Sequence, residues 1–200
     1  MSEHTYNTVE QTATAEYKDR GSRFLAHSFP VKTTAEVKSR LQGIKKEHPK
    51  ATHHCYAYRL GTEGLQFRVS DAGEPSGSAG KPILGQIDRL EVTDVLVIVV
   101  RYFGGTLLGL PGLKNAYKSA AALALQMTPV ITRHLERRYR LGFDYTMTDS
   151  VLQLIRRYHG TIYHRETQLF CTLDAGIPLS NVEDCLRQFR EIPGLQVDPV

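Results

Sequence analysis

The hydrophobic pattern of the first two thirds of the chain predicts strands and helices in turn. Residues 95–100 are apolar throughout, which is typical of a central strand covered on both faces. After Gly112 apolar side chains recur at helical spacing, and Pro129 closes that helix. We predict strands at 17–20, 23–29, 53–60, 65–69 and 95–100, and helices that begin at 33 or 34, at Pro82 and near 113.

The last third of the chain has a periodicity of its own. We predict a strand at 139–147, a helix capped by Asp149 or Ser150 and ended by Gly160, strands at 161–165 and 168–174, a helix begun by a capping box of Ser180 and Glu183, and a last strand at 194–198. This β-α-β-β-α-β order is typical of a small ferredoxin-like domain. The sequence therefore predicts an α+β protein with two domains, at residues 1–132 and 137–200, and a connector at 130–136.

Composition and charge narrow the class of protein. The chain has 200 residues, enough for one large domain or two small ones, and 41% of them are hydrophobic, which argues against a disordered or fibrous chain. Residues 1–132 hold 16 basic and 12 acidic residues, whereas residues 133–200 hold 9 of each, so the net charge of +4 belongs to the first domain. An excess of this size allows binding to phosphate without requiring it.

Cysteine usage and the N-terminal residues favour a cytoplasmic protein. The three cysteines are widely spaced and form no CxxC pair, which indicates a reducing compartment. The longest apolar run is far shorter than the roughly 20 residues that cross a bilayer. Residues 1–5 lack the basic and apolar stretches of a secretory signal. We therefore expect a cytoplasmic protein without a membrane segment.

Two glycine-rich loops, at 71–82 and 104–112, each precede a predicted helix. Pro75 and Pro82 break the phosphate-loop pattern, and Leu107 breaks the dinucleotide pattern. Both loops can still bind an anion, because small residues leave backbone N–H groups accessible and a helix N-terminus is partly positive. The alternative is a tight turn that needs glycine for its conformation. The candidate nucleic-acid or anion-binding residues are Ser76, Ser78, Gly80, Lys81, Arg101, Lys114 and Lys118.

His53, His54 and Cys55 are candidates for metal or catalytic chemistry. Alternate residues of a strand share a face, so His53 and Cys55 lie together and His54 does not, and two ligands are too few for a closed zinc site. No metal is therefore predicted. Asp71 and Glu74 beside a histidine would allow general acid–base catalysis, although no Gly-x-Ser-x-Gly motif is present. Capping or solvated turn residues are the other interpretation of these two acids.

Basic and aromatic residues also gather in the last third of the chain. They are Arg137, Arg138, Arg140, Arg156, Arg157, Tyr158, His159, Tyr163 and Arg165. Ferredoxin-like sheets bind RNA through stacked aromatic residues, but the recognised aromatic motif is absent here. A nucleic-acid surface and a solvated helix face both remain open, because this region carries no net charge.

Three segments together resemble the YigZ/IMPACT family. They are His53-His54-Cys55, residues 70–82 and residues 100–113, and they occur in the family's order and at its spacing. Ala72 stands where the family usually has a second aspartate, and Pro111, which lacks an N–H donor, where it usually has a second glycine. The motif residues without an assigned role are His53, His54, Asp71, Gly73, Glu74, Gly104, Gly105, Gly109 and Gly112.

The resemblance implies a fold and a biological setting. It implies an N-terminal domain with the ribosomal-protein-S5 domain-2-like fold and a ferredoxin-like C-terminal domain similar to those of elongation factors. In eukaryotic relatives the family domain belongs to a translational regulator that competes for the activator of the amino-acid-starvation kinase. Those relatives carry a further interaction domain that is not found in these 200 residues. For members with the present layout, nucleic-acid or ribosome binding is inferred from the fold.

These observations predict a non-enzymatic RNA- or ribosome-associated protein that regulates translation and needs no cofactor. Its surface would consist of the two glycine loops with Lys81, Arg101, Lys114 and Lys118. One alternative is a hydrolase-like enzyme that uses Asp71 and Glu74 with His53 or His54. The other is a protein-interaction module whose partner acts in translation control.

Overall fold

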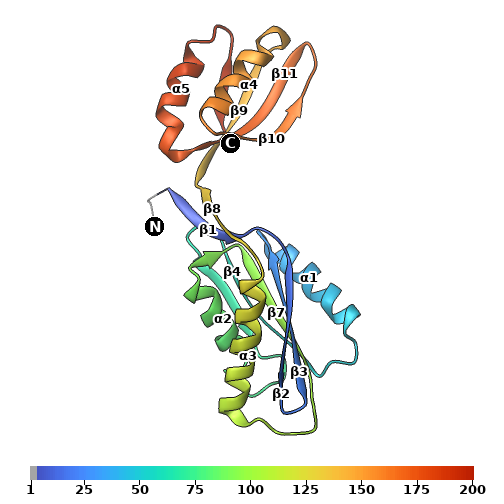
Figure 1. Ribbon diagram of the computed structural model, residues 1–200. Helices are drawn as coiled ribbons and strands as arrows, with labels where there is room; N and C mark the ends of the chain where they lie inside the picture. The colour runs from blue at the N-terminus through green and yellow to red at the C-terminus, as the bar shows by residue number, and fades with distance from the viewer. Residues whose placement is uncertain (1–3) are drawn as a thin grey trace. The chain divides into compact units, whose positions relative to one another are not determined.

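The computed structural model describes residues 4–200 and divides them into two compact units. One unit consists of residues 6–133 and the other of residues 4–5 and 134–200. Both contain helices and strands, so the protein is α+β with two domains (Figure 1). Residues 1–3, part of the stretch in which we find no secretory signal, lie outside the described residues. Among residues 4–200, no helix is both long enough and apolar enough to span a bilayer.

The unit of residues 6–133 is built on a five-stranded antiparallel sheet. Its strands, in spatial order, are β2 (Ala13–Asp19), β3 (Ser22–Pro30), β7 (Val95–Tyr102), β4 (His53–Leu60) and β5 (Gln66–Ser70). The apolar run of β7 is fully buried at the centre of the sheet, which confirms the prediction from its unbroken hydrophobic pattern.

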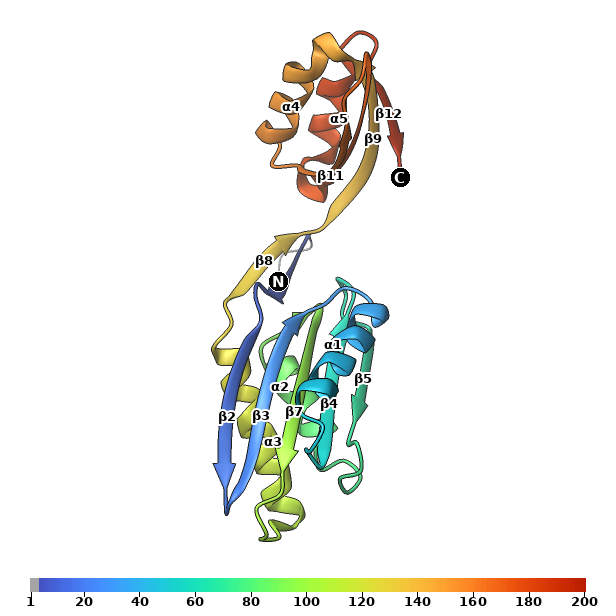
Figure 2. The same ribbon diagram turned by 90° about the vertical axis from the view of Figure 1, so that its right-hand side faces the viewer.

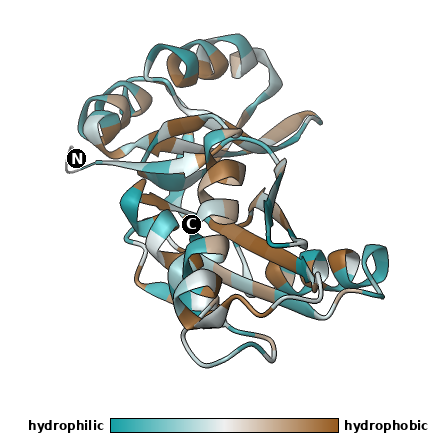
Figure 3. Ribbon diagram, turned by 60° about the horizontal axis from the view of Figure 1, so that its bottom comes forward, coloured by the Kyte–Doolittle hydropathy of each residue, from teal (hydrophilic) through white to brown (hydrophobic). Residues whose placement is uncertain are grey.

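Three helices cover the two faces of this sheet. α1 (Thr34–Glu47) lies on one side, and α2 (Gly80–Arg89) and α3 (Gly109–Gln126) lie on the other (Figure 2). Alternate residues of β7 serve the two faces: Val97 and Val99 belong to the core beneath α2 and α3, whereas Leu96 and Ile98 belong to the core beneath α1. Hydrophobic and hydrophilic residues alternate along the helices accordingly (Figure 3).

Three strands that the hydrophobic pattern does not reveal complete this region. β1 (Thr5–Val9) lies between β6 (Val92–Thr93) and β8 (Val130–His134) in a small second sheet. The boundary between the two units, between residues 133 and 134, falls within the predicted connector 130–136, but residues 130–134 form the strand β8, which was not predicted. β8 is mostly exposed, so its side chains give no alternating signal, and its pairing with β1 joins residues far apart in the sequence.

The C-terminal unit has a single four-stranded antiparallel sheet. Its elements are β9 (Glu136–Asp144), α4 (Thr148–Arg157), β10 (Thr161–Glu166), β11 (Phe170–Pro178), α5 (Val182–Arg190) and β12 (Gln196–Pro199), with the 3-10 turns Tyr145–Met147 and Leu179–Asn181 before the two helices. The strands lie in the order β10-β11-β9-β12. Leu141, Leu173 and Phe189 are among the residues of its core.

Several helix starts differ from the predictions. α2 begins at Gly80, so Pro82 is its third residue, and α3 begins at Gly109, inside the predicted loop. Proline is tolerated throughout the first turn because the N–H groups there have no partner within the helix.

In the C-terminal unit the predicted caps are not formed. Neither Asp149 nor Ser150 caps α4, and Asp144 accepts the N–H of Thr146 in the preceding turn instead. Ser180 Oγ donates to Asn181 Oδ1, so the capping box is absent. The predicted strand 139–147 ends at Asp144, where this turn begins.

Candidate functional site

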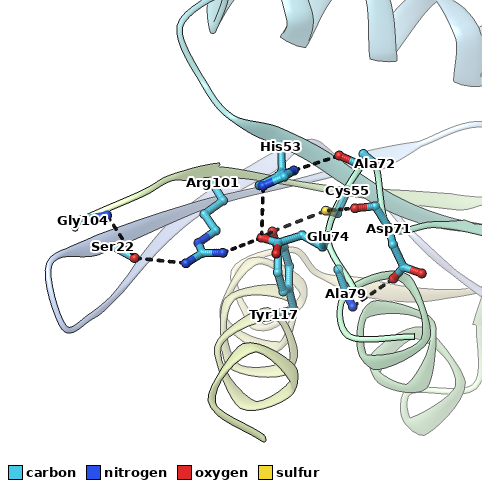
Figure 4. Close-up of polar contacts among 10 residues, drawn as sticks. All are labelled: Ser22, His53, Cys55, Asp71, Ala72, Glu74, Ala79, Arg101, Gly104 and Tyr117. Carbon is cyan, nitrogen blue, oxygen red and sulfur yellow. Dashed lines mark hydrogen bonds and ion pairs between the residues drawn. The ribbon is translucent and has the colours of Figure 1, made fainter. Parts of the chain in front are cut away.

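Polar side chains from four segments meet at one end of the five-stranded sheet (Figure 4). Glu74 lies in the loop after β5, and its Oε1 accepts hydrogen bonds from Nη1 of Arg101 at 2.7 Å and from the hydroxyl of Tyr117 at 2.8 Å. His53, the first residue of β4, places Nε2 3.8 Å from the same oxygen. The register explains the meeting, because His53 pairs with Arg101 across β4 and β7.

The ion pair between Glu74 and Arg101 is buried. Glu74 is 8% exposed and Arg101 5% exposed. The guanidinium carbon lies 5.5 Å from the ring centres of both Phe24 and Phe103, and Nη2 donates to Ser22 Oγ at 3.4 Å. Nε of Arg101 has no hydrogen-bond partner among residues 4–200. Because a buried charge is costly unless it is paired, this arginine is committed to Glu74 and is not a free cation for phosphate.

The carboxylate of Asp71 binds the backbone N–H groups of its own loop, where an external anion would otherwise bind. Its carboxylate accepts the backbone N–H groups of Gly77 at 2.8 Å, Ala79 at 3.0 Å and Gly80 at 2.8 Å. Partial burial acts to raise the pKa of Asp71, but these three donors and the charge of Lys81 outweigh it and leave the pKa below its usual value. The amides that the sequence analysis offered to an external anion are therefore already engaged within the protein.

Cys55 and Tyr117 form the inner wall of the polar cluster. The Cys55 thiol lies 2.9 Å from the carbonyl oxygen of Asp71 and 3.3 Å from the Tyr117 hydroxyl. Burial raises the pKa of Cys55 to about 12, so the sulfur stays a protonated thiol at neutral pH. A protonated thiol is a poor nucleophile, and this cysteine acts as a packing residue.

The two histidines of the motif lie in different environments. Nδ1 of His53 is 2.9 Å from the carbonyl oxygen of Ala72, which holds the ring beside Glu74. His54 points to the opposite face of β4, where Nε2 lies 3.2 Å from the carbonyl oxygen of His48, and burial lowers its pKa. Of the residues named for an enzyme, the structure therefore brings together only His53 and Glu74.

Two motif glycines are required by close backbone contacts. A Cβ added at Gly104 would lie 1.9 Å from the carbonyl carbon of Gly21, and one added at Gly80 would lie 2.8 Å from the backbone nitrogen of Ser70. Because Gly104 has no side chain, the second glycine loop can approach the turn between β2 and β3. Because Gly80 has none, α2 can approach the end of β5. Gly73 and Gly105 lie in the same two loops, whereas Gly109 and Gly112 lie in the first turn of α3. A structural need therefore accounts for glycine at Gly104 and Gly80.

A pocket of about 510 Å³ opens beside the polar cluster. We call it the loop pocket; it is lined by residues 52–53, 74–75, 101, 103, 107–110 and 113. His53, Glu74 and Arg101 supply its polar part, and Phe103 with the leucines of the second glycine loop supply its apolar part. Sequence reasoning missed this pocket, although exposed apolar residues within a glycine-rich loop, such as Leu107 and Leu110, are a signal that could have indicated it.

The three candidate lysines remain exposed on the surface. Lys81, Lys114 and Lys118 form no ion pair with any described residue, and no acidic residue occurs between Asp94 and Glu136. α2 and α3 pack side by side (Figure 1). Residues at the start of α3 line the loop pocket, and Gly80 at the start of α2 lies close to Ser70 at the end of β5, so Lys81 and Lys114 lie toward the same end of the sheet. Ser76 is exposed, whereas Ser78 is buried and its hydroxyl has no hydrogen-bond partner in the part of the chain that the structure describes.

The basic and aromatic residues of the C-terminal unit do not form one surface. Tyr163 packs over Gly176, on the side of β11 away from the core, and the Arg138 guanidinium lies 3.9 Å from its ring centre. Arg156 and Arg157 lie on α4, which packs against the core side of β11. Across residues 4–200, no three His, Cys, Asp or Glu side chains are grouped so that they could hold a metal ion.

Comparison with known proteins identifies the family. Residues 20–125 match the family model of the Impact N-terminal domain. The chain is 37% identical over 153 residues to the IMPACT family member YvyE of Bacillus subtilis, which covers 76% of this chain and 70% of that protein. It is 33% identical over 169 residues to the IMPACT family member YigZ of Escherichia coli, which covers 84% of this chain and 81% of that protein.

A solved structure is similar over the full length. The crystal structure of a hypothetical protein superposes with a TM-score of 0.75 at 28% identity, and the match covers 98% of each chain. The family model includes His53, both glycine loops and the polar cluster around Glu74. The resemblance seen in the sequence motifs is therefore confirmed, and the chain belongs to the IMPACT family.

Proposed function

We propose that this protein regulates translation in the cytoplasm as a non-enzymatic binding protein, and that its partner is RNA, free or in the ribosome. The implied translational role of the family supports the first part of the proposal. The second part rests on the surface of residues 6–133, which holds the lysines described above. A protein partner in translation control remains an expectation from the resemblance.

The observation that carries the proposal is the set of lysines on α2 and α3 that form no ion pair with any described residue. Lys81, Lys114 and Lys118 are exposed, and α3 contains no acidic residue to neutralise them. The N-termini of both helices add partial positive charge at the same end of the sheet. Such a surface attracts a polyanion through long-range electrostatics and holds it through contacts to phosphate.

The proposed contacts differ in part from those suggested by sequence. Lys81, Lys114, Lys118 and the exposed Ser76 would contact phosphate directly. Arg101 would act indirectly, since it is paired with Glu74, and the N–H of Gly80 is held by Asp71. Ser78 is buried and would not reach an RNA strand on the surface.

A filter-binding experiment tests the proposal with a matched control. The triple variant Lys81→Ala, Lys114→Ala, Lys118→Ala removes the surface, and Lys38→Ala, Lys45→Ala, Lys46→Ala removes the same charge from α1 on the other face of the sheet. With a single-stranded RNA, each phosphate-contacting lysine contributes about 0.7 to the slope of log K against log salt. We expect the first variant to flatten this slope by about 2 and the second to leave it unchanged. Equal effects of both variants would contradict the proposed surface.

An enzyme is a second candidate, favoured by the 3.8 Å approach of His53 to Glu74 within a pocket. The arrangement offers one histidine and one carboxylate, with the thiol of Cys55 protonated and Asp71 engaged by its loop. Hydrolysis of phosphoesters or dipeptides that Glu74→Gln abolishes would support this candidate. Turnover that the variant leaves unchanged would exclude it.

We also propose fold names for the two units. The β-α-β-β-α-β order of residues 136–199 and the strand order β10-β11-β9-β12 support a ferredoxin-like fold. The ribosomal-protein-S5 domain-2-like fold for the first unit rests on the family resemblance. A fold shared with translation proteins is consistent with the proposed function but is a weak argument for it.

A further inference from the structure

The loop pocket combines an apolar wall with a polar floor that is incompletely hydrogen-bonded. Phe103, Leu107 and Leu110 are exposed large apolar residues on its wall. On the floor, Oε1 of Glu74 accepts two hydrogen bonds, whereas Oε2 accepts none from residues 4–200. Nε of Arg101 also lacks a partner, although the side chain is only 5% exposed. Buried polar atoms are normally paired, so Nε of Arg101 calls for an explanation, and Oε2 of Glu74 is left as an acceptor for a ligand.

The shape and lining of this pocket fit a flat, largely apolar ligand with polar atoms at one edge. A pocket of about 510 Å³ is within the usual range for small ligands. The aromatic ring of Phe103 and the neighbouring leucines can pack against the faces of a planar group. The carboxylate of Glu74 can accept N–H groups from its edge. A nucleobase has both planar apolar faces and N–H groups at its edge, whereas an aliphatic side chain offers only an apolar surface.

The surroundings of the pocket supply the charge that a nucleotide needs. Leu113 lines the pocket and Lys114, the next residue, is exposed and unpaired. Lys81, the second residue of α2, follows the pocket-lining Pro75 by six positions. Proteins that recognise single-stranded RNA commonly splay out one base, pack it against apolar or aromatic groups and bind its edge by hydrogen bonds.

We propose that the loop pocket binds one unstacked guanine base of single-stranded RNA, with the flanking phosphates held by Lys81 and Lys114. This inference rests on the proposed function and names the recognition element within it. Guanine is chosen because its N1–H and N2–H groups are neighbouring donors that can reach Oε2 of Glu74, the carboxylate oxygen that accepts no hydrogen bond from residues 4–200. An apolar peptide side chain would fill the wall but leave Glu74 Oε2 unpaired, and it would make no use of the lysines.

Three oligonucleotides of equal length test the proposal by fluorescence anisotropy. Each is an adenine tract with one central position that carries guanine, adenine or no base, so that all three have the same phosphates. The wild-type protein should bind the guanine strand about tenfold more tightly than the abasic strand, with the adenine strand between them, because one buried hydrogen bond to a charged group and the packing of the base are lost. Equal affinity for all three strands would overturn the proposal.

Matched leucine variants separate the pocket from the lysine surface. Leu110→Asp places a negative charge at the pocket, where the leucine is 51% exposed, and Leu65→Asp makes the same change in a turn outside the pocket, where the leucine is 76% exposed. We expect Leu110→Asp to abolish the preference for guanine and Leu65→Asp to retain it. Glu74→Gln should also reduce the preference. Because Leu110 is exposed, its variant keeps the test valid even if Glu74→Gln fails to fold.

The two proposals fail in different ways. The triple lysine variant should weaken binding to all three strands alike, whereas the pocket variants should change only the differences between strands. Failure of the wild-type protein to bind any strand contradicts the proposed function, and failure also to bind guanosine 5′-monophosphate overturns the pocket inference. Binding of free guanosine 5′-monophosphate as tightly as the guanine strand would overturn the assignment to RNA.

Discussion

Two arginine–carboxylate pairs, one in each unit, lie in opposite environments. In residues 6–133, Arg101 and Glu74 form a buried pair at 2.7 Å beside a pocket. In the C-terminal unit, Arg140 and Asp174 form a pair of similar length, 2.8 Å, across the open surface of two strands. The core of that unit consists of apolar residues and two cysteines.

The difference points to where function resides. A buried ion pair is often no more stabilising than apolar residues of the same volume, so stability alone does not account for one. Charged groups held in a cleft are typical of binding and catalytic sites. The comparison therefore directs attention to the loop pocket of the first unit, and changes at the two pairs should have very different consequences.

The largest effect is expected from breaking the buried pair. Arg101→Met keeps most of the side-chain volume between Phe24 and Phe103 but leaves Glu74 buried without its cation. We expect the free energy of unfolding to fall by about 3–5 kcal/mol. Urea denaturation of the wild type and the variant measures it, and a further Glu74→Leu substitution should recover part of the loss. A fall of less than about 1 kcal/mol, the size expected for a solvent-exposed ion pair, would contradict this prediction.

An intermediate effect is expected at the loop that Asp71 organises. Asp71→Ala removes the acceptor for three backbone N–H groups at the start of α2, and we expect a loss of about 1–2 kcal/mol. The pKa of Asp71 is lowered from 3.8, so its stabilisation is complete above that pH and is lost as the pH falls through the lower, folded-state pKa. Urea denaturation at neutral pH and in acid should show the difference between wild type and variant shrinking in acid. A difference that stays constant would contradict this role.

A small gain in stability is expected next to Asp71. Ala72 has a φ of +45°, in the left-handed region that L-residues other than Asn and Asp seldom adopt. Ala72→Gly relieves that strain at a cost in unfolded-chain entropy, and we expect a net gain of about 0.5 kcal/mol. Thermal unfolding provides the measurement. Ala79→Gly, at a buried position with a φ of −125°, is the control and should lose stability.

The smallest effect is expected at the exposed pair. Arg140→Ala removes the partner of Asp174 on the surface, where water and salt screen the interaction. We expect the urea midpoint to stay within experimental error at physiological salt. A loss as large as that of Arg101→Met would remove the contrast between the two units.

Regular elements were predicted well where one hydrophobic signal dominates. The buried run of β7, the bounds of β4 and the apolar stripe of α3 all follow from local patterns. β1 and β8 were missed because backbone pairing between distant segments, rather than side-chain alternation, makes them strands. The caps of α4 and α5 were misassigned because the chain turns before each helix instead of entering it directly.

The site was predictable only in part. His53, Glu74 and the lysines follow from motif and charge, but Tyr117 had the appearance of an ordinary apolar-stripe residue. Its hydroxyl reaches Glu74 across 43 positions of sequence, which no local pattern can report. Asp71 was considered as a catalytic acid, whereas its carboxylate accepts backbone N–H groups and so holds its own loop in place.

The sequence by itself determined the family, the main helices and strands, and the location of the basic excess in residues 1–132. Those properties follow from residue type and short-range periodicity. Only the tertiary structure decided that Arg101 is neutralised by Glu74 while Lys81, Lys114 and Lys118 stay free. The physical reason is that a charge is available or unavailable according to its burial and its partners, and both depend on segments that the fold brings together from across the chain.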